Sequence, residues 1–196
     1  MFGGLYGPAG IVGEVPQEAP LRMVDVSWRH ETAAILGARL TMWLSERLGA
    51  EASIAYSPSN LKRKVAGTVD DAPVFGSTEY ETKVLAAAGR GVLRFGSAQD
   101  AVRFQVLGGL GVVSRAGDVY ESVEGATGLA LVIGGGFRVR LAPNVLIRVD
   151  VEDYLSKVEL IVKEPLSETL LVVPGTSLGS HFRSDFLFVQ SLVLEL

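Results

Sequence analysis

The sequence predicts an all-β chain of one domain, folded as an eight-stranded antiparallel up-and-down barrel. Three observations support this fold class. Apolar residues recur at every second position in eight segments, short and long connections between these segments alternate, and 48% of the 196 residues are hydrophobic. Successive side chains of a strand point to opposite faces, so each segment has one apolar face. We expect residues 1–196 to form a single β-barrel domain.

The eight segments share this alternation. We expect strands at residues 2–8, 34–44, 50–57, 84–95, 102–113, 128–141, 145–154 and 185–196. Two of them, 34–44 and 84–95, would also suit helices by composition, but the alternation of their neighbours favours strands. The stretches "GGLG" and "GGG" lack phosphate-loop spacing, so we interpret them as strand glycines that allow curvature.

The connections alternate strictly in length. The short ones are "SERLGA", "GSAQDA" and "APN", and the long ones are residues 9–30, 57–80, 114–127 and 156–183. This is the layout of a transmembrane β-barrel, with short turns on one side and long loops on the other. A tilted spanning strand needs about 9–11 residues, which these segments supply, whereas no stretch approaches the roughly 20 apolar residues of a transmembrane helix.

Charged residues interrupt the segments on the face opposite the apolar one. Arg148, Asp150 and Glu152, for example, alternate with apolar neighbours. In a membrane barrel the apolar face contacts lipid, and the narrow interior of eight strands forces inward charges to pair with each other. We therefore expect a charge network in the lumen. Its members are Arg39, Glu51, Arg90, Arg94, Arg103, Arg138, Arg140, Arg148, Asp150 and Glu152, with Asp185 and Glu195 also pointing inward.

The chain resembles the small eight-stranded outer-membrane barrels of Gram-negative bacteria, the family of the OmpA barrel and OmpX. The opening "FGGLYGP" is similar to first strands of that family, and residues 185–196 are similar to its C-terminal assembly signal, although Leu196 stands where the family usually has Phe or Trp. The resemblance implies a non-enzymatic barrel of the bacterial outer membrane, used for envelope structure or for adhesion and partner binding through its loops. The start of the chain does not look like a signal peptide, so we expect a mature chain whose signal peptide was removed.

Two loop segments are candidate contact sites. Residues 157–175 keep an apolar period of two about a Pro-containing turn at 163–168, which suggests a protein partner or self-association, with packing against other loops as the alternative. This candidate partner surface consists of Val158, Leu160, Val162, Leu170 and Val172. The run Lys62-Arg63-Lys64 is either a solvated loop tip or a contact to lipopolysaccharide phosphates, in addition to the membrane lipid. The net charge of −4 gives no reason to expect nucleic acid as a partner.

Residues suited to catalysis or metal binding are sparse. The chain has no Cys and only His30 and His181, so we expect no cofactor and no metal site. The stretch "HFRS" (181–184) is similar to the His and Ser of outer-membrane acyl hydrolases, but a His–Ser pair alone does not establish a nucleophile and its base. Three alternatives stay open: a soluble lipocalin-like carrier of small apolar ligands, an outer-membrane lipid hydrolase, and a narrow channel for anions or small apolar molecules.

Overall fold

Strands make up most of the molecule. A computed structural model describes residues 1–9, 13–19, 22–69, 72–97, 99–121, 123–124, 126–162 and 177–194. The elements in chain order are β1 (Phe2–Ala9), β2 (Gly13–Ala19), β3 (Arg22–His30), β4 (Ala33–Trp43), β5 (Leu48–Val69), β6 (Ala72–Phe95), β7 (Val102–Ala116), α1 (Asp118–Glu121), β8 (Val123–Glu124), β9 (Thr127–Ala142), β10 (Val145–Val162) and β11 (Ser177–Leu194). None of the described residues form a helix that is long and apolar enough to cross a membrane.

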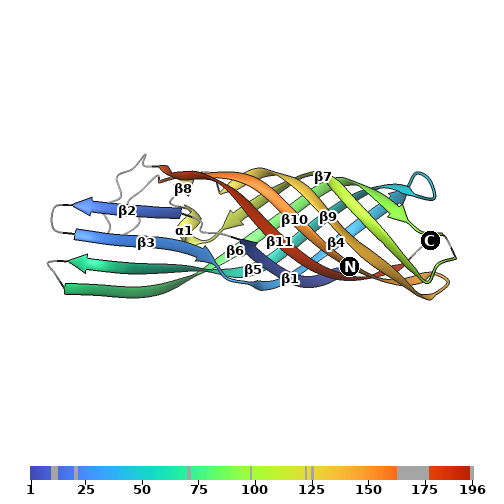
Figure 1. Cartoon of the computed structure of the whole chain (residues 1–196), viewed down its shortest axis with the longest axis horizontal. Coiled ribbons are helices and arrows are strands. Elements are labelled where there is room, and N and C mark those ends of the chain that lie inside the picture. The colour runs from blue at the N-terminus through green and yellow to red at the C-terminus, as the bar shows by residue number, and fades with distance from the viewer. Residues whose placement is uncertain are drawn as a thin grey trace.

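Eight of the strands close into an antiparallel ring. Each pairs with the next in the order β1, β4, β5, β6, β7, β9, β10 and β11, and β11 returns to β1. The first and last strands seal the ring, because Phe2 of β1 lies opposite both Gly37 of β4 and Ser191 of β11. The barrel predicted from the sequence is therefore confirmed, and Figure 1 shows its tilted strands wrapped about the long axis of the molecule.

Alternation along each strand places apolar side chains outside the ring and charged ones inside. In β7, Phe104 is 63% exposed, whereas its neighbours Arg103 and Gln105 are buried. In β9, Leu131 is exposed and Val132 is completely buried. A lipocalin-like carrier requires the opposite arrangement, with apolar faces lining the interior. The outward apolar side chains and inward charges of this barrel therefore do not fit a lipocalin-like carrier.

Large apolar side chains surround the ring on its outer face, and we call them the apolar belt. The belt includes Leu36, Leu40, Ile54, Leu85, Leu93, Phe104, Val106, Leu110, Leu129, Leu131, Ile133, Ile147, Phe188 and Leu192, all of them exposed. Exposed apolar surface on this scale is unusual for a soluble monomer and marks a surface that another apolar medium covers.

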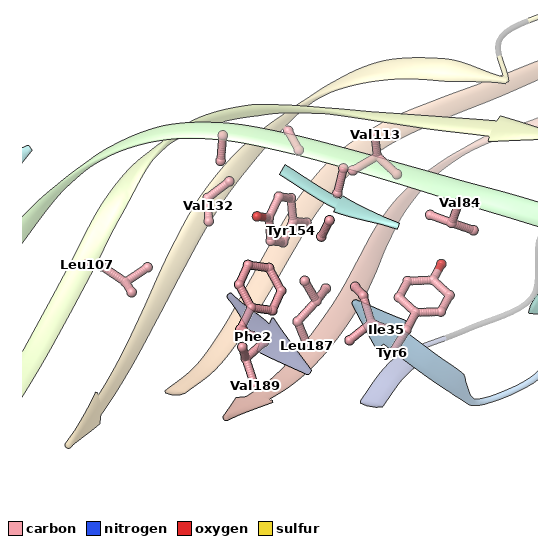
Figure 2. Close-up of a cluster of buried hydrophobic side chains, with 14 of the residues drawn as sticks. Phe2, Tyr6, Ile35, Val84, Leu107, Val113, Val132, Tyr154, Leu187 and Val189 are labelled. Atoms are coloured by element: carbon pink, nitrogen blue, oxygen red, sulfur yellow. The ribbon is translucent and has the colours of Figure 1, made fainter. Parts of the chain in front are cut away.

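The lumen also holds an apolar cluster, which the sequence did not lead us to expect in a charged interior. Its members include Phe2, Ile35, Val84, Leu107, Val113, Val132, Tyr154, Leu187 and Val189. Figure 2 shows these side chains pointing from several strands into the space that the ring encloses. Leu187 lies opposite Glu152 and Val189 lies opposite Asp150, so part of the cluster lies next to the buried charges of β10.

The long connections contain strands, which corrects the expectation that they are loops. β2 and β3 form a hairpin that pairs with the second half of β5, and β5 and β6 stay paired as far as Val69 opposite Ala72. Side chains on both faces of residues 75–79 are exposed, so this part of β6 shows no burial alternation. Without one buried face, a period of two gives no signal for a strand.

The other two long connections also contain regular structure. The third holds α1 and β8, and β8 pairs with β10. In the fourth, β10 and β11 stay paired as far as Ile161 opposite Ser177, in agreement with the predicted continuation of this hairpin. The turn predicted at 163–168 lies outside the described residues. We call the end of the barrel that carries these additions the extended end and the opposite end the turn end; Figure 1 shows the additions gathered at the extended end.

Candidate functional site

Six charged side chains form a closed ring of ion pairs inside the lumen, and we call it the charge ring. In order around the ring, its members are Arg39, Asp150, Arg148, Glu51, Arg90 and Glu152. Every arginine donates to two carboxylates and every carboxylate accepts from two arginines. The charges alternate in sign and balance, which is the arrangement that buried ions need.

The contacts of the charge ring are short and almost free of solvent. Arg39 donates to Asp150 at 2.5 Å and to Glu152 at 2.7 Å, and Arg90 donates to Glu152 at 2.6 Å. Arg90 also donates to Glu51 at 2.9 Å. No side chain of the ring is more than 5% exposed. Planar guanidinium groups suit this role, because each can serve two carboxylates at once.

The remaining arginines predicted for the lumen lie between the charge ring and the turn end. Arg138 donates to Gln105, which in turn donates to Asp150, so hydrogen bonds link Arg138 to the charge ring. The guanidinium carbons of Arg94 and Arg138 lie 3.9 Å and 4.9 Å from the centre of the Trp43 ring. Both arginines therefore form cation–π contacts with this indole.

Three further residues were also predicted to lie in the lumen. Arg103 is buried and its Nη2 atom has no hydrogen-bond partner within the described part of the chain. Arg140 is half-buried. Glu195 lies outside the described residues.

Glycines on neighbouring strands make room for the charge ring. Gly136 lies opposite Asp150, and a methyl group at Gly136 would come within 2.3 Å of Asp150 Oδ1 and 2.1 Å of the Val149 carbonyl oxygen. Gly109 lies opposite Arg90, where a methyl group would come within 2.6 Å of Arg90 Cβ. We expected strand glycines that allow curvature, and at these two positions the glycines also leave space for buried side chains.

A second group of buried charges lies toward the extended end, and we call Tyr6, Arg115, Arg183 and Asp185 the upper cluster. Asp185 accepts hydrogen bonds from Tyr6 and from Arg183, both at 2.8 Å, and from Arg115. Arg183 also donates to the Tyr6 hydroxyl at 3.4 Å. Asp185 was predicted to point inward, but its two arginines lie in segments that the sequence analysis assigned to loops.

His30 and Tyr120 lie beyond the upper cluster. A hydrogen bond of 2.5 Å joins His30 Nε2 and the Tyr120 hydroxyl, and His30 Nδ1 lies 3.4 Å from the Ser59 hydroxyl. Burial, together with the positive charges of Arg183 and Arg115, lowers the pKa of His30 to about 3. Burial raises the pKa of Tyr120 to about 12. Both side chains are therefore neutral at pH 7, and no group of three or more His, Cys, Asp or Glu residues within the described ranges is placed to hold a metal ion.

The basic run is not at a loop tip, contrary to one of the two interpretations of its sequence. Lys62, Arg63 and Lys64 lie within β5, paired on one side with β3 and on the other with β6. Lys62 forms ion pairs with Glu79 at 2.8 Å and Glu31 at 3.6 Å. The guanidinium of Arg63 lies 5.7 Å from the centre of the Trp28 ring.

The candidate partner surface is only partly described. Val158, Leu160 and Val162 belong to β10, whereas Leu170 and Val172 lie outside the described residues. In the stretch "HFRS", Ser184 lies on the outer face of β11, between the inward Arg183 and Asp185, and donates to Asp153 at 2.6 Å. The Ser184 hydroxyl is thus bound to a carboxylate.

Sequence reasoning missed Arg115, Arg183, His30 and Tyr120. A signal for the first two was present, because Arg115 continues the odd-numbered inward series of 103–113, and Arg183 shares the parity of Asp185. No comparable signal was available for the other two, since the contact between His30 and Tyr120 joins residues 90 positions apart.

We expect Gly136→Ala to destabilise the barrel by roughly 1–3 kcal/mol, because the added methyl group overlaps Asp150 and the β10 backbone. The matched control is Gly89→Ala, where a methyl group would have no heavy atom within 4 Å. The measurement is urea-induced unfolding of the refolded protein. Equal stability of the two variants would contradict the spatial role of Gly136.

Glu51→Gln should lower stability by roughly 3–5 kcal/mol, because it opens the charge ring and leaves Arg90 and Arg148 each with one carboxylate. The same change at Glu79, which pairs with Lys62 at an exposed position, should have a small effect. Unfolding curves of both variants against the unmodified chain provide the test. A Glu51 variant as stable as the Glu79 variant would show that the charge ring does not hold the barrel together.

Acidification should destabilise the extended end through His30. The pKa of His30 is lowered on folding, so the unfolded chain takes up a proton below about pH 6.5 while the folded chain does not until about pH 3. Stability is therefore complete above about pH 6.5 and is lost toward pH 3, at up to about 1.4 kcal/mol per pH unit. Between pH 7.5 and 5.5 the unmodified chain should lose more stability than His30→Gln. Identical pH dependence of the two chains would contradict this account of His30.

The fold is similar to that of a solved outer-membrane barrel. The crystal structure of the outer membrane protein OprG from Pseudomonas aeruginosa matches with a TM-score of 0.63 and 14% sequence identity, over 98% of this chain and 91% of that chain. No protein-family model matches the sequence. No curated protein matches it either. At this identity the likeness supports the barrel architecture alone, so function rests on the residues described above.

Proposed function

We propose that the chain is an integral, non-enzymatic β-barrel of the bacterial outer membrane, with a lumen closed by charges and an extended end that contacts partners. The observation that carries this proposal is the combination of an apolar belt outside and paired charges inside. A bilayer offers no hydrogen-bond partners, so a closed ring of strands satisfies its own backbone and presents only apolar side chains to lipid. The likeness to OprG, an outer membrane protein, supports the same location.

The charge ring and the apolar cluster support the proposal of a closed lumen. Side chains of β4, β5, β6 and β10 meet in the charge ring, so it spans the interior from one wall to another. An interior of eight strands is filled by such side chains. A lumen filled in this way supports envelope structure or partner binding better than conduction of ions.

The extended end is the part of the chain best suited to contact partners. A sheet extends beyond the ring and consists of β2, β3 and the outer halves of β5 and β6. The residues of β6 before Lys83 pair with β5 on one side and with no described strand on the other side. Phe75, on this strand, is 78% exposed. The hairpin of residues 157–175 remains our candidate for a protein partner or self-association. The exposed Lys64 of β5 remains our candidate for lipopolysaccharide phosphates.

Arginine on the apolar belt tests the membrane assignment. Ile133 is 46% exposed near the middle of β9, and Ile133→Arg should cost about 2–4 kcal/mol of stability in lipid vesicles. Phe75→Arg is the matched control, because Phe75 is exposed on the extension beyond the ring and should tolerate the charge. The fraction of each chain that folds into vesicles is read from the gel mobility of unheated against boiled samples. Equal folding of both variants, or a chain that stays soluble without detergent, would contradict the proposal.

A further inference from the structure

The upper cluster carries an unbalanced positive charge. Arg115 and Arg183 are 3% and 5% exposed, and both bind the carboxylate of Asp185, which is 1% exposed. Two guanidinium groups therefore share one carboxylate among the described side chains. In the charge ring the same chain matches three arginines with three carboxylates. The upper cluster thus differs from the balanced charge ring in carrying one excess positive charge among the described side chains.

Several buried donors of the upper cluster have no hydrogen-bond partner among the described residues. They are Nε and Nη1 of Arg115 and Nη1 of Arg183, and the hydroxyl of Ser156 is also without a partner. Ser156 is 1% exposed and lies opposite Arg183 in the pairing of β10 with β11. Water would satisfy these donors but would leave the positive charge uncompensated, and an uncompensated buried charge is costly.

The neighbouring groups do not supply the missing negative charge. Tyr6 is held as a donor to Asp185, and Tyr120 binds His30. Both tyrosine side chains are buried, and burial raises the pKa of Tyr120 to about 12. The lowered pKa of His30 reflects, after burial, the positive charges of the same two arginines. Apart from Asp185, these described neighbours of the two arginines are therefore neutral.

We propose that the upper cluster binds a small soluble oxyanion, a phosphate or a carboxylate, between the free edges of Arg115 and Arg183, with Ser156 as a further donor. Guanidinium groups bind such anions through two parallel hydrogen bonds, which an isolated halide does not accept. The side chains point into the lumen, away from the apolar belt, so a lipid headgroup on the outer surface does not face them.

The regular pairing of the barrel strands ends next to the upper cluster, and this is where an anion would enter in our proposal. Pairing of β1 with β11 ends at Ala9 opposite Ser184, and β2 and β11 do not pair beyond it. On the far side, pairing of β6 with β7 ends at Lys83 opposite Ala116, directly after Arg115. Figure 1 shows the strands dividing into two groups at this end. The proposal does not depend on any partner of the extended end.

Phosphate binding to the complete refolded chain tests the proposal. The chain is held in a phosphate-free maltoside detergent, and inorganic phosphate replaces chloride at constant ionic strength. We expect a saturating rise of about 5 °C in the unfolding temperature and one-to-one binding by titration calorimetry. Arg183→Gln should lose both effects, and Arg183→Lys, which keeps the charge but lacks the planar fork, should weaken binding at least tenfold. Arg29→Gln, at an exposed position on β3, should behave like the unmodified chain.

Three results would overturn the proposal. The first is no calorimetric binding of phosphate or acetate to the unmodified chain, a result that needs no variant to fold. The second is equal stabilisation of the Arg29 and Arg183 variants, which would show general screening by salt. The third is a phosphate effect that is present in maltoside but absent in phosphatidylglycerol vesicles, because lipid headgroups would then be the occupants.

Discussion

The charge ring is the interaction on which the rest of the barrel depends. Once eight strands close on a narrow interior and apolar side chains occupy the outside, the remaining polar groups have no water to face. Three arginines and three carboxylates solve this problem by alternating in sign around a closed circuit. The charge ring in turn requires glycine on the neighbouring strands, because Gly136 and Gly109 leave the space that Asp150 and Arg90 occupy. The same constraint makes the excess positive charge of the upper cluster informative.

The ring of strands could be predicted from the sequence because burial imposes a period of two. One face meets an apolar surrounding and the other meets the lumen, so a shift of one residue would exchange the two faces. The inward positions of Arg39, Glu51 and Asp150 follow from that parity. Their partners do not, since contacts such as Arg39 with Asp150 join residues 111 positions apart. The odd or even position of a residue in its strand determines whether its side chain points inward or outward. Its position along the barrel axis depends on the shear of the closed ring.

The extended end could not be predicted in the same way. Residues such as those at 75–79 of β6 are exposed on both faces, so nothing in their pattern distinguishes a strand from a loop. Lys62 illustrates the consequence: its sequence suggested a solvated tip, whereas it lies mid-strand and pairs with Glu79. Arg115 and Arg183 were missed for a related reason, because the inward parity continues past the positions where the apolar face ends.

A barrel whose lumen is filled by side chains suits a structural or partner-binding role, whereas a channel needs an open lumen. The charge ring and the apolar cluster lie side by side in the interior, and the upper cluster lies toward the extended end. The most direct measurement is the conductance of the refolded, unmodified chain in a planar bilayer at high potassium chloride concentration. Our account predicts insertion without discrete conducting steps. Stable open steps from correctly folded protein would contradict the closed lumen.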